Sequence, residues 1–270
     1  MANSETRYPG GKSGSGVYQT LINLMPPHTC YVEPFLGGGA IMRLKRPAFR
    51  SYGVDSDLFN IGRWAHHKVP GLIVECGCGI RWLRRNDVIT PQTLVYCDPP
   101  YPMSVRSSKT PMYRHEMTDK QHLELLTVLR GLPCFVMVSS YPSPLYEQAL
   151  EGWSTVTYQS MTRNATQKTE QVWMNYTPPV RLHDYRFLGE NYRDRERLKR
   201  LVRRWRAKID RMPGLERLAL LSSLNESTPA ESATNRLKAV NPLPSGDRGR
   251  KDQSERDLKM FVESYAQLKL

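Results

Sequence analysis

Residues 94–101 read Leu-Val-Tyr-Cys-Asp-Pro-Pro-Tyr, a short apolar run followed by an acid, two prolines and an aromatic ring. The apolar run has the composition of a buried β-strand. Two prolines cannot continue a central strand, so we expect the strand to end at Cys97. Asp98 and Tyr101 would then lie on a stiff turn at the carboxyl end of a strand, which is the edge where open α/β sheets bind ligands.

The residues from Asp98 to Tyr101 suit one kind of chemistry. An exocyclic amine needs hydrogen-bond acceptors while it attacks an electrophile, and a flat base needs a ring on which to stack. The Asp98 carboxylate and the Pro99 carbonyl can accept those hydrogen bonds, and Tyr101 can supply the stacking face. Taken alone, the tetrapeptide could also be an ordinary proline-rich turn, so its meaning depends on the sequence around it.

The composition narrows the classes of protein to consider. A chain of 270 residues can form one large domain or two small ones, and its formal net charge of +13 favours a polyanionic partner without distinguishing DNA from RNA. No apolar run is long enough to span a bilayer, and the N-terminus lacks the apolar segment of a signal peptide. The five cysteines are odd in number and complete no set of metal ligands, so we expect reduced thiols and no metal. We also expect a cytoplasmic protein with no membrane contact.

Strand-like and helix-like pieces alternate along residues 31–97. This alternation is typical of an α/β protein with a doubly wound, mostly parallel sheet. Strands are expected at 31–35, 51–54, 72–76 and 94–97, with helices at about 40–45, 57–67 and 81–85 between them.

The elements after the tetrapeptide extend the same sheet. A capping box at Thr118 predicts a helix to about residue 130, and a fifth strand follows at 134–139. The strand-like runs 153–161 and 170–176 are joined by a polar turn, which predicts an antiparallel hairpin at the edge of the sheet.

A glycine-rich turn and an acid form a second constellation upstream. The turn spans residues 35–39 and follows the first strand, where glycines let the backbone pass close to a ligand. Asp55 ends the second strand, the position from which an acid binds a ribose diol in doubly wound nucleotide-binding proteins. This turn, followed by Asp55 and then by the tetrapeptide, is far more specific than any of the three alone.

With these residues in order, the chain resembles the Dam-type (D12 class) adenine-N6 DNA methyltransferases over residues 7–177. The order of the motifs, cofactor before catalytic, is that of the family's α-type arrangement. The pieces that carry the resemblance are Tyr8-Pro9-Gly10-Gly11-Lys12, Glu33-Pro34-Phe35-Leu36-Gly37-Gly38-Gly39, Asp55 and Asp98-Pro99-Pro100-Tyr101, with a looser likeness at Ser139-Ser140-Tyr141 and Trp173-Met174-Asn175-Tyr176.

The resemblance implies a Rossmann-like fold that uses S-adenosylmethionine as its cofactor and methylates adenine in DNA. It implies that the turn at 35–39 holds the methionine end of the cofactor, that Asp55 binds the ribose, and that Asp98 serves both cofactor and target. Catalysis would fall to Asp98, Pro99, Pro100 and Tyr101. The cofactor-binding residues would be Tyr8, Gly11, Lys12, Glu33, Pro34, Phe35, Gly37, Gly38, Gly39, Asp55 and Asp98.

DNA is the partner that the resemblance implies, and the target adenine would have to be flipped out of the duplex. Basic residues near the tetrapeptide and in the hairpin turn are candidates for phosphate or base contacts, although they could equally serve solubility alone. We expect a monomer or a weak dimer. The candidate DNA-binding residues are Arg106, Lys109, Arg114, His115, Arg163 and Lys168.

The C-terminal third differs in composition from the rest. From residue 181 to residue 211 there are 12 basic and 5 acidic residues, and apolar residues recur there at helical spacing. The helix could present a solvated basic face or could contact phosphates. We therefore expect a methyltransferase domain at 1–180, a basic helical extension at 181–224, a flexible linker at 225–252 and an amphipathic helix at 253–270.

Two departures from the family leave other functions open. The βα units use up the residues between Gly39 and Asp98, so no recognition domain is inserted there, and such a short form would suit a phage or prophage and a bacterial or phage-infected cell. The acid that often follows the third strand has no clear counterpart in residues 75–79. The alternatives are an RNA adenine or cytosine-N4 methyltransferase, and a catalytically inactive DNA-binding protein on the same scaffold.

Overall fold

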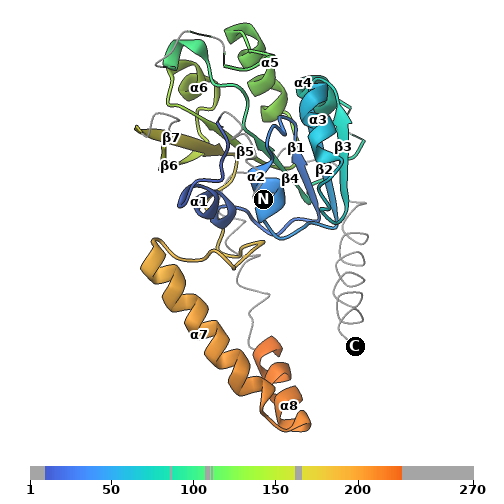
Figure 1. Cartoon of the computed structure of the whole chain (residues 1–270), viewed down its shortest axis with the longest axis vertical. Coiled ribbons are helices and arrows are strands. Elements are labelled where there is room, and N and C mark those ends of the chain that lie inside the picture. Colours follow the sequence, from blue (N-terminus) through green and yellow to red (C-terminus); the bar gives the residue numbers. More distant parts are fainter. Residues whose placement is uncertain (1–9, 86, 107–109, 111, 162–165, 227–270) are drawn as a thin grey trace, which may run out of the picture. The chain divides into compact units, whose positions relative to one another are not determined.

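The computed structural model describes residues 10–85, 87–106, 110, 112–161 and 166–226. These residues form a seven-stranded sheet in the order β3-β2-β1-β4-β5-β7-β6 (Figure 1). Strands β1 to β5 run parallel, and β7 pairs antiparallel with both β5 and β6. The predicted doubly wound sheet with an antiparallel edge hairpin is therefore confirmed. The strands are β1 (Cys30–Glu33), β2 (Arg50–Asp55), β3 (Leu72–Cys76), β4 (Thr93–Cys97), β5 (Phe135–Ser140), β6 (Ser154–Met161) and β7 (Gln167–Met174).

The strand order reverses between β1 and β4. From β1 the chain proceeds outward through β2 to β3 and then returns to β4 on the other side of β1. The two strands are in direct register, with Cys30 opposite Thr93 and Val32 opposite Val95. Loops that leave adjacent strands in opposite directions open a crevice at the carboxyl ends, which is where doubly wound sheets bind ligands.

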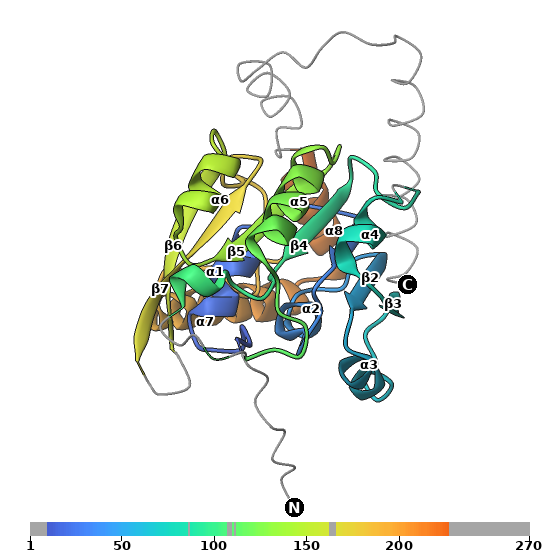
Figure 2. The ribbon, with the colours of Figure 1, turned by 90° about the horizontal axis from the view of Figure 1, so that it is seen from above.

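Successive side chains of the buried strands belong alternately to two hydrophobic cores, one on each face of the sheet. On β4, Val95 and Cys97 belong to the core beneath the later helices, whereas Leu94 and Tyr96 belong to the core beneath the earlier helices. Helices α5 and α6 lie side by side on the first of these faces (Figure 2). The helices around the sheet are α1 (Val17–Asn23), α2 (Ala40–Leu44), α3 (Leu58–Trp64), α4 (Gly79–Leu83), α5 (Asp119–Arg130) and α6 (Pro144–Ala149), with a short 3-10 helix at Met103–Val105.

Local signals explain where several helices begin. The Thr118 hydroxyl accepts a hydrogen bond from the backbone N–H of Gln121, so the predicted capping box opens α5. Ser143 caps α6 in the same way, with Pro144 in the first turn. We did not predict the short helices α1 and α6.

The C-terminal part contains α7 (Tyr192–Asp210) and α8 (Gly214–Glu226). Pro213 lies between these two helices. The chain divides into two compact units between Arg204 and Trp205, inside α7. The division expected at residue 180 stays a prediction. The expected linker lies outside the described residues apart from its first two positions, which belong to α8, and the expected helix at 253–270 lies wholly outside them. In the described part, no helix is both long and apolar enough to cross a membrane.

Candidate active site

A cavity of about 450 Å³ opens at the carboxyl ends of β1, β2 and β4. Both sequence constellations reach it, since the glycine turn after β1 and Asp98 after β4 line the same space. Residues from the N-terminal loop and from the loop before α5 complete its wall. The predicted site residues that line it are Gly11, Lys12, Glu33, Pro34, Phe35, Gly37, Gly38, Gly39, Asp55, Asp98, Pro100, Arg114 and His115.

The glycine turn is held in one conformation by neighbouring elements. Gly37 and Gly39 have φ values of 46° and 51°, a left-handed backbone that favours glycine. The indole Nε1–H of Trp64 donates a hydrogen bond to the Gly37 carbonyl at 3.1 Å. A side chain at position 39 would collide with the Trp64 ring, so the turn and α3 fit closely only because glycine is there.

Asp55 connects this turn to the start of α3. One carboxylate oxygen of Asp55 accepts a hydrogen bond from the Gly37 N–H at 2.7 Å, and the other accepts one from the Asp57 N–H at 2.8 Å. Asp57 in turn caps α3 by accepting a hydrogen bond from the Phe59 N–H at 3.0 Å. Asp57 also lines the cavity, and sequence reasoning missed it although its place before a helix was visible.

Asp98 is held by two residues, one near in sequence and one distant. The Lys12 ammonium lies 2.7 Å from Asp98 Oδ1, and the Tyr101 hydroxyl lies 3.2 Å from the same oxygen. The Lys12 side chain is 5% exposed and that of Asp98 is 21% exposed. Burial raises the pKa of Asp98 above its ordinary value, with Lys12 opposing the shift and Glu170 adding to it.

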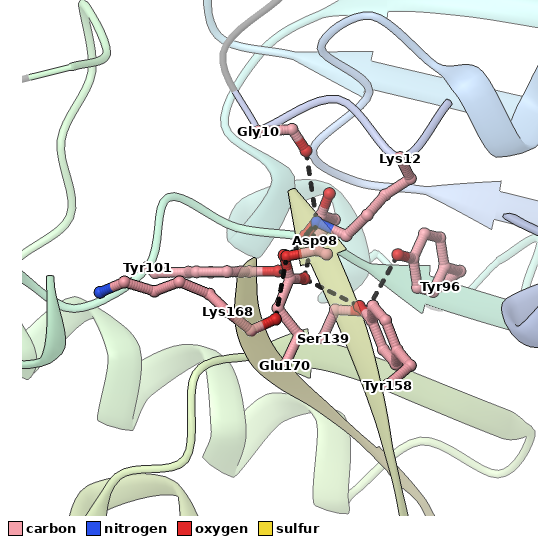
Figure 3. A network of polar contacts seen from close by, with 10 residues as sticks. Gly10, Lys12, Tyr96, Asp98, Tyr101, Ser139, Tyr158, Lys168 and Glu170 are labelled. Atoms are coloured by element: carbon pink, nitrogen blue, oxygen red, sulfur yellow. Dashed lines mark hydrogen bonds and ion pairs between the residues drawn. The ribbon is translucent and has the colours of Figure 1, made fainter. Parts of the chain in front are cut away.

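A second buried carboxylate, Glu170 on β7, lies beside this pair (Figure 3). It accepts hydrogen bonds from the hydroxyls of Tyr101 at 2.6 Å and Tyr158 at 2.9 Å, and it lies 3.3 Å from Lys12 Nζ. Burial alone would raise the pKa of Glu170, but Lys12 and the hydrogen bonds hold it below its ordinary value. Burial likewise opposes the charge of Lys12, yet Asp98 and Glu170 hold the pKa of Lys12 well above its ordinary value. Sequence reasoning missed Glu170, whose only signal was an acid inside a strand.

Glu33 forms the floor of the cavity at the end of β1. It is 4% exposed and accepts a hydrogen bond from the Tyr31 hydroxyl at 2.7 Å. Burial raises the pKa of Glu33 to about 8, because its effect outweighs the opposing effects of the Tyr31 hydrogen bond and the Lys45 charge. Burial therefore favours the uncharged form of this acid at the cavity.

Arg106 has a different place from the DNA contact we expected. Its guanidinium is buried and binds Glu116 through two hydrogen bonds of 2.8 and 2.7 Å. Its Nε–H donates to the Tyr101 carbonyl at 2.6 Å. Because these donors are engaged inside the protein, Arg106 braces the turn that carries Tyr101, and we remove it from the candidate DNA-contacting residues.

The remaining basic candidates are distributed around the site. Arg114 and His115 are exposed at the mouth of the cavity, and Arg114 lies 3.6 Å from Asp57. Lys168 lies 5.3 Å from the centre of the Tyr141 ring, which in turn packs edge-on to Tyr101 at 4.8 Å. Tyr8, Lys109 and Arg163 lie outside the described residues.

The region after β3 explains the missing acid of the family pattern. Glu75 accepts a hydrogen bond from the Trp82 Nε1–H at 2.9 Å and does not line the cavity. At this corner the wall is formed by Cys78, Gly79 and Ile80. The five cysteines are free thiols, and the described residues contain no group of three or more His, Cys, Asp or Glu side chains that could hold a metal ion.

Comparison with known proteins gives a likeness of fold at low identity. No protein-family model and no curated protein match the chain. The solved structures that resemble it include a precorrin-8W decarboxylase of Methanobacterium thermoautotrophicum (12% identity, covering 62% of this chain and 91% of that one, TM-score 0.40) and an rRNA methylase of Streptococcus thermophilus (13%, 58% and 93%, 0.40). Another is the magnesium protoporphyrin IX methyltransferase of Synechocystis with bound S-adenosylmethionine (12%, 59% and 76%, 0.35). At these identities and scores the likeness identifies no substrate.

Proposed function

We propose that the protein transfers a methyl group from S-adenosylmethionine to the N6 amine of adenine in DNA. The observation that carries this proposal is the single cavity lined by both the glycine turn after β1 and Asp98 after β4. The resemblance of these residues to the Dam-type enzymes supplies the reaction. The geometry supports it by bringing together, from distant parts of the chain, the groups that the reaction needs.

The cavity suits a cofactor of this size and polarity. Its volume of about 450 Å³ lies in the range of small-molecule sites, about 300–1,000 Å³. The glycine turn would hold the methionine end, Asp55 and Asp57 would face the ribose, and Ile80 would pack against the base. When bound, the cofactor supplies a methyl group on a positively charged sulfur; the C–S electron pair stays on sulfur as the nitrogen lone pair of the target forms the new bond.

The tetrapeptide after β4 would receive the target base. Asp98 Oδ1 faces Lys12, so we assign Oδ2 and the Pro99 carbonyl to the amine protons. The Tyr101 ring would stack on the flipped base, with Tyr141 beside it. The proton that leaves the nitrogen passes to Asp98 or to solvent. Catalysis would then consist mainly of orientation and of acceptors placed before the reaction begins.

The N-terminal portion of α7 supplies a surface for the DNA backbone. Its two acids there are already paired, Asp194 with Arg197 and Glu196 with Lys199. Arg193, Arg203 and Arg204 are exposed on the same helix. Exposed positive charges attract phosphates regardless of base sequence, which would suit an enzyme that lacks an inserted recognition domain.

A direct assay tests the proposed function. The purified chain is incubated with isotopically labelled S-adenosylmethionine and, separately, with duplex DNA, single-stranded DNA and RNA, and the products are digested to nucleosides for mass spectrometry. We expect label in N6-methyladenine from DNA. Label in RNA alone or in N4-methylcytosine would replace the proposed substrate, and cofactor binding by calorimetry without any transfer would identify an inactive scaffold.

A further inference from the structure

We propose that Glu170 is a positioning residue for the methyl transfer, which takes the Tyr101 hydroxyl proton, shares the Lys12 ammonium with Asp98 and so keeps Asp98 able to accept the target amine. This inference rests on the proposed function for its chemistry. It concerns a residue far from the tetrapeptide in sequence, which reaches the site only through the edge hairpin.

The position of Glu170 follows from the pairing of the hairpin strands. Glu170 on β7 lies directly opposite Tyr158 on β6, and the Tyr158 hydroxyl donates to its carboxylate at 2.9 Å. Strand β7 pairs with β5, which is the neighbour of β4, so the hairpin brings this carboxylate to the site of Asp98. Its side chain is 8% exposed, and a carboxylate this buried requires partners.

The distances show how the donors are shared. The Tyr101 hydroxyl has one proton, and the shorter distance, 2.6 Å to Glu170 against 3.2 Å to Asp98, directs that proton to Glu170. The Lys12 ammonium lies 2.7 Å from Asp98 and 3.3 Å from Glu170, and it also donates to the Tyr101 oxygen at 2.8 Å. One cation thus serves two carboxylates.

Removal of the Glu170 charge would change the state of Asp98. Lys12 would pair with Asp98 alone, and the Tyr101 proton would be free to turn toward the same oxygen. Asp98 would then hold two donors and would be a weaker acceptor for the amine. The other titratable groups that act on Asp98 are Lys12 from the N-terminal loop, Tyr31 and Glu33 from β1, Tyr96 and Cys97 from β4, Tyr101, Tyr113 from the loop before α5, Tyr141 after β5, Tyr146 from α6 and Tyr158 from β6.

The substitution Glu170→Gln tests the inference, because it keeps the shape of the side chain and removes the charge. We expect kcat to fall by about 10²-fold, the size of effect that misplaced reacting groups produce. Cofactor affinity should change less than kcat, since Glu170 does not line the cavity and reaches it only through Lys12 and Tyr101. The acid limb of the kcat–pH profile should move to lower pH, because the charge of Glu170 raises the pKa of Asp98 and its loss lets Asp98 stay ionised in more acidic solution. Glu170→Asp should recover part of both properties, and Glu147→Gln on the exposed face of α6 is the matched control.

A second readout does not depend on turnover. The carboxyl carbons of aspartates are labelled with ¹³C, Asp98 is assigned through the Asp98→Asn variant, and its titration is followed by NMR in the wild type and in Glu170→Gln. A lower pKa of Asp98 in the variant supports the inference. A folded Glu170→Gln protein with wild-type kcat and an unchanged Asp98 titration would overturn the inference. So would a fall in kcat that is explained by lower thermal stability alone, with the kcat–pH profile unchanged. Absence of transfer by the wild type would contradict the proposed function, and the NMR titration would still decide the coupling of Glu170 to Asp98.

Discussion

At the scale of single residues, Asp55 has two tasks that the sequence could not separate. Its position after the second strand predicted a ribose contact, and the residue does line the cavity. The structure adds that both carboxylate oxygens already accept backbone hydrogen bonds, from Gly37 and from Asp57. The carboxylate therefore shapes the glycine turn as well as lining the cavity.

We predict that Asp55→Ala weakens both cofactor binding and the fold around the turn. It leaves two backbone N–H groups without their partner, each at a cost of about 1–3 kcal/mol where water cannot replace it. Calorimetry with S-adenosylmethionine and urea unfolding would show a raised Kd together with a lowered free energy of unfolding. Asp57→Asn is the control for the stability readout, because asparagine also caps helices and should leave the free energy of unfolding nearly unchanged. An Asp55→Ala protein with wild-type affinity would show that the turn needs no such support.

Arg106 shows why a basic loop residue is hard to interpret from sequence alone. Sequence gives its charge and its place after the tetrapeptide, both consistent with a phosphate contact. The sequence does not show that the Glu116 carboxylate binds this guanidinium. The same carboxylate also accepts hydrogen bonds from the backbone N–H groups of Met112 and Tyr113. The pair shapes the loop that forms one wall of the cavity.

We predict that the stability contributed by this pair depends on pH. Burial raises the pKa of Glu116, but the hydrogen bonds from Arg106 and the loop backbone lower it to about 2 from the ordinary 4.5. The pair therefore stabilises the folded state fully above about pH 4.5 and loses its effect as the pH falls toward 2. Urea unfolding should show Arg106→Gln to be clearly less stable than wild type at pH 7, with the difference shrinking at pH 3. An equal difference at both values would contradict the assignment.

At the scale of elements, the sequence predicted the strands of the sheet but few of the side-chain contacts between strands that are distant in sequence. Short apolar or strand-like runs, bounded by turn signals and alternating with helix-like pieces, predicted all seven strands to within three residues of their ends. Glu170 escaped notice because its role depends on which strand lies beside β7 and which face it presents, and neither property is local. Tyr158 on the partner strand shows the same limit.

Helix α7 carries a prediction about DNA affinity. The double substitution Arg203→Gln with Arg204→Gln removes two exposed charges of the helix, so affinity for duplex DNA should fall for all sequences alike. The slope of log K against log salt should decrease by up to about 2, close to one per lost phosphate contact. Fluorescence anisotropy at several salt concentrations measures both quantities.

The matched control is Arg84→Gln with Arg85→Gln, which removes the same net charge directly after α4. Arg84 and Arg85 already pair with Glu124 and Glu75, so they should contribute less to phosphate binding. Equal losses in the two double variants would mean that total charge, rather than α7, sets the affinity.

At the scale of the whole sheet domain, one topological fact produces the site. The strand order places β1 beside β4, so the glycine turn and the tetrapeptide leave the sheet at neighbouring points. This much followed from the sequence, because alternating strands and helices predict a doubly wound sheet and such sheets bind ligands where the order reverses. The target base, its strand context and the role of the C-terminal helices did not follow, because they depend on surfaces rather than on strand order.

The most direct test of the central claim is the content of N6-methyladenine in DNA from a host without DNA methylation of its own. The host expresses either the wild-type chain or the Asp98→Ala variant at matched levels, and nucleosides are quantified by mass spectrometry. We predict N6-methyladenine in the DNA of cells with the wild type and none with Asp98→Ala, while the variant protein remains folded. Equal N6-methyladenine in both, or none in either despite soluble protein that binds S-adenosylmethionine, would contradict the account.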